Sequence, residues 1–133
     1  MASAQLTGPR MPVLRLNVFL VLTLGLVGST PTFAEVDYEQ EVKPILRDHC
    51  YACHGAFNQE SDLRLDTGAA MRIGGGSGPA VIGGDPDESL LIQVVTGEAG
   101  YRMPPEDQGS PLSEEDIDTL RRWIAEGANS PAD

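Results

Sequence analysis

The feature that most constrains this chain is a five-residue cluster that holds both of its cysteines. Cys50 and Cys53 are three positions apart, and His54 follows directly in the sequence Cys50-Tyr51-Ala52-Cys53-His54. The other histidine, His49, precedes the cluster. Both thiols and both imidazoles of the 133-residue chain therefore lie within six consecutive positions, so any chemistry of these groups has to be built there.

The Cys-x-x-Cys-His spacing is the pattern of covalent haem attachment in c-type proteins. On a helical turn, each of two thiols three residues apart can form a thioether with one haem vinyl group. The next residue can then present its imidazole to the iron. We therefore expect one covalent haem c, attached through Cys50 and Cys53, with His54 as the proximal iron ligand.

Three other interpretations of the two cysteines are less favoured. A disulfide between Cys50 and Cys53 would close a very short loop and stabilise little. A zinc site would need four ligands, and only His49 remains nearby. A thioredoxin-like redox motif would need a βαβ pattern, which this sequence lacks.

An electron carrier usually has a second axial ligand, and methionine is the one that raises the potential. Met103 lies in Tyr101-Arg102-Met103-Pro104-Pro105, 49 residues after His54, where prolines stiffen an irregular loop. Met71 follows two alanines and is typical of core filling. We expect Met103 as the sixth ligand, with Met71 or no protein ligand as alternatives. His49 adjoins Cys50 and cannot easily reach the far face of a haem, so we interpret it as a surface or helix-end residue.

Several other residues carry weaker hypotheses. Arg64 and Arg102 could bind haem propionates, because arginine pairs well with carboxylates, but solvated surface positions are the simpler interpretation. Tyr101 and Trp123 are interpreted as packing residues, with contact to the haem as the alternative. The glycine-rich segment 74–78 lacks the Gly-Lys-Ser/Thr ending of a phosphate loop, which argues against nucleotide binding.

The N-terminal segment has the pattern of a secretory signal peptide. Arg10 and Arg15 precede an apolar run over residues 18–27, and small residues follow up to Ala34. The run is short for a membrane span, which needs about 20 apolar residues. We expect a signal peptide over residues 1–34, cleaved near Ala34, and a periplasmic or otherwise exported domain over residues 35–133. A retained N-terminal anchor is the alternative; with cleavage, no membrane insertion is expected.

The charge of residues 35–133 limits the partners of this domain. Seven basic residues stand against 20 acidic ones, which gives a net charge of -13. Such a surface repels nucleic acid and anionic lipid. It favours redox partner proteins with a basic docking patch, although the charge could also serve solubility alone.

The hydrophobic pattern predicts an all-α domain of short helices separated by loops rich in glycine and proline. The first helix is expected over Glu39–His49; because Pro44 is acceptable only in a first turn, regular helix could begin nearer Glu41, with Asp37 to Gln40 as a lead-in turn. A turn of helix is expected over Gly68–Ile73. A third helix should begin at Asp85-Pro86 and end at Gly97, and the last should begin at Ser113 and end at Gly127.

A series of short motifs extends from about Tyr38 to Ala128. It consists of Val42-Lys43-Pro44-Ile45-Leu46, Cys50-Tyr51-Ala52-Cys53-His54-Gly55, Leu63-Arg64-Leu65-Asp66, the glycines at 74–76, Gly84-Asp85-Pro86-Asp87-Glu88-Ser89-Leu90-Leu91, Met103-Pro104-Pro105, Leu112-Ser113 and Trp123-Ile124-Ala125-Glu126-Gly127-Ala128. In this order the motifs resemble the planctomycete-type cytochrome c domain, within the class I cytochrome c group. The resemblance implies a small all-α fold around one haem, held by Cys50 and Cys53, with His54 and Met103 as axial ligands.

These observations favour an exported monohaem electron carrier that catalyses nothing itself. Two alternatives stay open. The chain could be the electron-accepting subunit of a periplasmic oxidoreductase complex. It could also be a haem-based sensor with an open sixth position, a reading that a stable methionine ligand would count against.

Overall fold

The computed structural model describes Met1, Gly8 and residues 34–131. The chain divides into two units, Met1–Thr32 and Phe33–Asp133, and all elements below belong to the second. Apart from Met1, Gly8 and Ala34, the expected signal peptide lies outside the described residues. Its cleavage near Ala34 stays a prediction.

The second unit is helical, and residues 34–131 contain no strand, which confirms the expected all-α class. None of the helices described in these residues has the length and apolar character needed to cross a membrane. In chain order the elements are the π-helical turn η1 (Tyr38–Val42), α1 (Lys43–His49), α2 (Tyr51–His54), the 3-10 turn η2 (Glu60–Asp62), α3 (Gly68–Ile73), α4 (Leu90–Thr96) and α5 (Glu114–Ala125).

The first helix begins with a wide turn because of Pro44. A proline has no N–H, so the regular bond from residue 44 to the Gln40 carbonyl cannot form. The Lys43 N–H instead donates to the Tyr38 carbonyl, one residue further back than in an α-helix. Regular α-helix therefore starts at Lys43, two residues after the later expected start at Glu41, and ends at His49 as expected.

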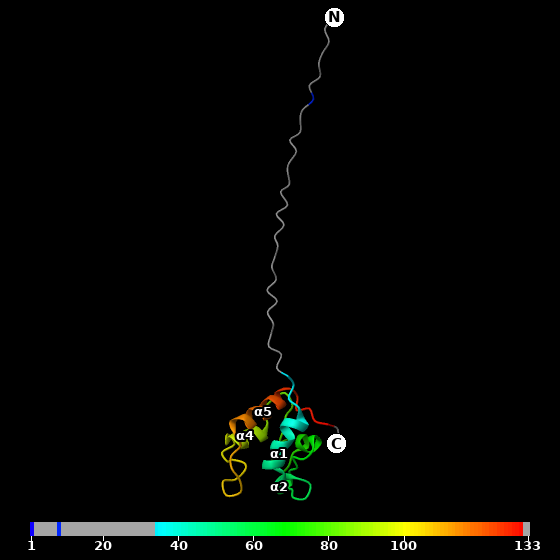
Figure 1. Ribbon diagram of the computed structural model, residues 1–133. Coiled ribbons are helices and arrows are strands. Elements are labelled where there is room, and N and C mark those ends of the chain that lie inside the picture. Colours follow the sequence, from blue (N-terminus) through cyan, green and yellow to red (C-terminus); the bar gives the residue numbers. More distant parts are fainter. Residues whose placement is uncertain (2–7, 9–33, 132–133) are drawn as a thin grey trace. The chain divides into compact units, whose positions relative to one another are not determined.

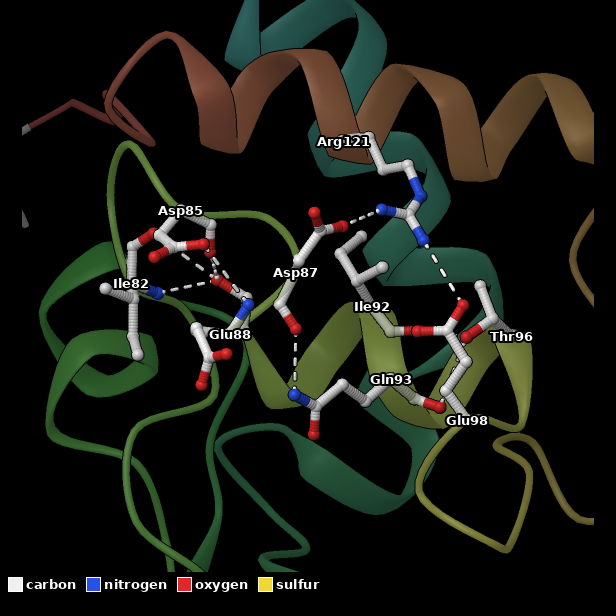
Figure 2. Close-up of polar contacts among 10 residues, drawn as sticks. Ile82, Asp85, Asp87, Glu88, Ile92, Gln93, Thr96, Glu98 and Arg121 are labelled. Carbon is white, nitrogen blue, oxygen red and sulfur yellow. Dashed lines mark hydrogen bonds and ion pairs between the residues drawn. The ribbon is translucent and has the colours of Figure 1, made fainter.

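The expected start of the third helix is wrong by four residues, because α4 begins at Leu90 and not at Pro86. Asp85 does accept a hydrogen bond from the Glu88 N–H at 3.3 Å, but this turn does not continue (Figure 2). The hydroxyl of the buried Ser89 donates to the Asp85 carbonyl at 2.8 Å and accepts from the Ile82 N–H at 2.9 Å. These contacts hold Ser89 in an extended conformation, so it becomes the residue before the helix.

The last helix, α5, follows its sequence signals closely. The Ser113 hydroxyl accepts from the Asp116 N–H at 3.1 Å, and Asp116 in turn accepts from the Ser113 N–H, which forms a capping box. The apolar face of α5 is buried at Leu120, Trp123 and Ile124. The indole N–H of Trp123 donates to the Asn129 carbonyl at 2.7 Å, so this buried side chain keeps its polar atom satisfied.

The helices pack against one another on one side of the unit, and loops form the other side. α5 packs against α4 and η1, while α1 packs against η1 and α2. The loop after α2 and the long loop between α4 and α5 extend away from α5 (Figure 1). Apolar side chains of η1, α1, α4 and α5 form one core, which also includes Met71 of α3. The residues of the Cys-x-x-Cys-His cluster therefore lie at the edge of this core and not within it.

Candidate functional site

The break between α1 and α2 sets the positions of the two cysteines and His54. Cys50 leaves helical geometry, with φ -125° and ψ -39°, but its N–H still donates to the Leu46 carbonyl at 2.8 Å. The Cys50 carbonyl then accepts from the N–H groups of Cys53, at 3.1 Å, and His54, at 2.8 Å. The backbone thus forms the helical turn that the spacing predicted, and a hydrogen bond ties this turn to the buried Leu46 of α1.

Cys50, Cys53, His54 and Met103 line the same cavity, which has a volume of about 400 Å³. Met103 comes from the loop after α4, far along the chain from the other three. Met71 does not line this cavity and is 1% exposed in the core. The structure therefore places all four expected site residues together and sets the alternative methionine apart.

The part of the cavity wall that α4 forms is apolar. Leu90, Leu91, Val94 and Val95 of α4 line it, together with Leu63 and Leu65. An apolar lining excludes water and suits a large, flat apolar ligand. The sequence marked the α4 residues only as a core face, so their role in the cavity was missed. Helical periodicity by itself does not distinguish a core from a ligand site.

The glycine-rich segment forms a tight turn that completes another part of the wall. Gly75, Gly76 and Gly78 line the cavity. Gly74 has φ +80°, and a Cβ there would overlap the Gly78 carbonyl oxygen. The Gly76 N–H donates to the Ser61 carbonyl at 2.8 Å, which holds this turn against η2. The turn needs glycine for close backbone approach and not for phosphate binding.

Met103 is tied to α4 through the backbone. Its N–H donates to the Val94 carbonyl at 2.9 Å, and the neighbouring Arg102 donates from Nη2 to the Thr96 carbonyl at 3.1 Å. Met103 itself is half-buried and packs against the core. The position of this methionine therefore depends directly on the position of α4.

The two thiols of the site differ in environment. Burial raises the pKa of Cys50 to about 12. The pKa of Cys53 is raised by burial and by the nearby Glu60 carboxylate. Both thiols are free, with no disulfide between them. They are therefore protonated at neutral pH, unlike the low-pKa cysteine of a thioredoxin-like site.

The residues of the cavity fit an iron porphyrin. His54 presents a buried ring Nδ1 that has no hydrogen-bond partner among the described residues. Imidazole and thioether are ligands that haem iron takes, and two adjacent thiols can hold the group covalently. A zinc site does not fit, because no three His, Cys, Asp or Glu side chains within the described part of the chain group closely enough to hold a metal ion.

The weaker candidates fall into two groups. Arg64, Arg102 and Trp123 do not line the cavity. Arg64 makes two bonds to the Asp66 carboxylate, at 2.8 and 2.9 Å. Tyr101 and His49 do line it, and the ring of Tyr101 is half exposed. The sequence treated His49 as a helix-end residue, and it is indeed the last residue of α1.

Comparison with known proteins bears on this site directly. Residues 50–107 match the family model described as Planctomycete cytochrome C. The matched segment begins at Cys50 and includes His54, α4 and Met103. Searches of curated proteins and of solved structures find no match.

Proposed function

We propose, from the match of residues 50–107 to the planctomycete-type cytochrome c family, that the chain is an exported carrier of one haem and of single electrons. The family implies covalent haem c, haem-dependent electron transfer and redox partner proteins in general. The single haem, the ligand pair, export and a basic partner are the finer parts of the proposal.

One observation carries the proposal: two thiols, an imidazole and a thioether line the same apolar cavity. The sulfur atoms of Cys50 and Cys53 would hold haem c covalently, and His54 and Met103 would be its axial ligands. When bound, the haem supplies an iron that exchanges one electron at a time. The apolar side chains of α4 would exclude water from it, which favours a stable methionine ligand over an open position.

The acidic surface supports a basic partner. Residues 35–133 carry a net charge of -13, so a donor or acceptor with a positive docking patch would be attracted. In this role the domain fixes the ligands and the dielectric environment of the iron and catalyses no reaction.

The test is the absorption spectrum of the mature protein, expressed with c-type maturation machinery. We expect a c-type α band in the reduced state and the near-infrared methionine-to-iron charge-transfer band in the oxidised state. Met103→Ala should abolish the charge-transfer band, because the thioether is lost. Met71→Ala, the matched control, should keep it at some cost in stability.

Other results would change the proposal in defined ways. Covalent haem without the charge-transfer band in the wild type would contradict His/Met ligation and favour an open sixth position. Loss of the band in Met71→Ala, with retention in Met103→Ala, would reverse the ligand assignment. Absence of covalent haem would contradict the carrier function itself.

A further inference from the structure

We propose that Arg121 of α5 is a positioning residue for Met103, because it ties α5 to the segments at both ends of α4. The inference rests on the proposed ligation of iron by Met103. Figure 2 shows the Arg121 guanidinium reaching from α5 towards Asp87 on one side and Glu98 on the other. These two carboxylates lie just before and just after α4.

The two contacts use different nitrogens of the same guanidinium. Nη1 lies 2.6 Å from the Asp87 carboxylate, and Nη2 lies 3.6 Å from that of Glu98. Asp87 also belongs to the turn before α4, where its carbonyl accepts from the Gln93 side chain at 2.8 Å. Arg121 is 31% exposed, whereas Asp87 and Glu98 are 84% and 57% exposed. The guanidinium is therefore the more buried partner in both ion pairs.

The path from α4 to Met103 is short. The Met103 N–H is bonded to the Val94 carbonyl, and the loop that leads to it starts at Gly97, beside Glu98. Within that loop the Ala99 N–H donates to the Gln93 carbonyl at 3.1 Å. A shift or rotation of α4 would move these carbonyls and carry the methionine with them.

Apolar packing sets which face of α4 is buried, because Leu91, Ile92 and Val95 are buried against the rest of the core. The ion pairs of Arg121 add to this packing at points before and after the helix. Exposed ion pairs contribute little to stability one at a time. Two ion pairs from one planar guanidinium, to points before and after α4, restrict the rotation of this helix. A lysine would restrict it less, because its ammonium group is a single point charge.

The next residue of α5 is a matched control. Arg122 also forms an ion pair, from Nε to Asp118 Oδ2 at 3.0 Å, but this partner lies one turn earlier in the same helix. Its side chain is 41% exposed, close to the value for Arg121. Arg122→Gln therefore removes the same charge without releasing α4.

In the experiment the pH of the oxidised holoprotein is raised stepwise. The midpoint pH is the pH at which half of the charge-transfer band, and with it the methionine ligand, has been lost. Arg121→Gln should lower the midpoint pH. The equilibrium constant for loss of the methionine ligand should rise about threefold, which is the effect expected from removing two exposed ion pairs. Arg122→Gln should leave the midpoint unchanged. Arg121→Lys should restore it in part. Asp87→Asn and Glu98→Gln should each give a smaller shift in the same direction, and these milder variants carry the test if Arg121→Gln does not fold.

Equal shifts in Arg121→Gln and Arg122→Gln would overturn the inference, because only net charge would then matter. An unshifted midpoint in Arg121→Gln, Asp87→Asn and Glu98→Gln would overturn it as well. If the wild type lacks the band, the proposed ligation fails, and this inference fails with it. If the wild type has the band and the Arg121 variants do not shift its midpoint pH, this inference fails but the proposed ligation by Met103 stands.

Discussion

At the scale of single residues, two side chains of the same type can lie in different environments. Cys50 and Cys53 are the same residue type on the same turn, yet burial dominates the pKa of Cys50 and a carboxylate also acts on Cys53. Met71 and Met103 differ in the same way, since one fills the core and the other lines the cavity. Residue type sets the chemistry that a side chain offers, and its place in the fold decides whether a ligand in the cavity could reach it.

The Arg64–Asp66 pair gives a pH-dependent prediction at this scale. The Arg64 hydrogen bonds hold the pKa of Asp66 below its ordinary value of 3.8. The ionised carboxylate therefore stabilises the folded state, fully above that ordinary value and progressively less as pH falls through the folded pKa. Arg64→Gln should lower the free energy of unfolding at neutral pH, and the difference from wild type should shrink in acid. Urea unfolding at a series of pH values measures it.

The control for this prediction is the exposed Arg47–Asp48 pair. Both of its side chains are more than half exposed, so solvent screens the interaction. Arg47→Gln should change the free energy of unfolding little at any pH. A difference between wild type and Arg64→Gln that stays constant down to strongly acidic pH would contradict the role given to Asp66.

At the scale of elements, short helices depend on what surrounds them. α5 has its own capping box, twelve residues and a continuous apolar face, so its local sequence is sufficient to place it. α4 has seven residues and begins where the buried Ser89 bonds to neighbouring loops. Isolated helices of this length are unstable in water, so tertiary contacts decide where α4 begins.

The glycine turn that lines the cavity gives a prediction at this scale. Gly74 and Gly84 both have positive φ, +80° and +87°, but a Cβ meets the Gly78 carbonyl oxygen at Gly74 and open space at Gly84. Gly84→Ala should cost only the backbone strain, about 1 kcal/mol in the free energy of unfolding. Gly74→Ala should cost at least about 2 kcal/mol and reduce haem incorporation, because the displaced turn lines the cavity.

Chemical denaturation and the ratio of haem to protein measure the two effects. Equal destabilisation by Gly74→Ala and Gly84→Ala would contradict the close approach of the two backbone segments. Full haem incorporation in Gly74→Ala would contradict the part assigned to this turn.

At the scale of the whole molecule, the net charge of -13 over residues 35–133 predicts how small oxidants react with the reduced protein. A trivalent hexaammine cation should be attracted and a hexacyanide anion repelled. Raising the ionic strength from about 10 mM to about 100 mM shortens the screening length from roughly 30 to roughly 10 Å. The rate with the cation should therefore fall severalfold and the rate with the anion should rise, as measured by stopped-flow absorbance.

A neutral quinone oxidant is the control, and its rate should be nearly independent of salt. The same response of the cation and the anion to salt would show that the surface charge does not steer encounters. In that case the acidic residues would serve solubility, and the expectation of a basic partner would lose its main support.

The amino-acid sequence by itself determined the bounds of α3 and the N-cap of α5, because each depends on residues close together along the chain. It also indicated the all-α class and the cytochrome c family, through short motifs that follow one another in a set order. The tertiary structure decided the shared cavity of His54 and Met103, the late start of α4 and the bridge from Arg121. These features join segments far apart in sequence, and local propensity carries no information about which distant segments meet. The sequence favoured Met103 over Met71, but whether Met103 and His54 line one cavity depends on how the helices pack, because the two residues are far apart along the chain.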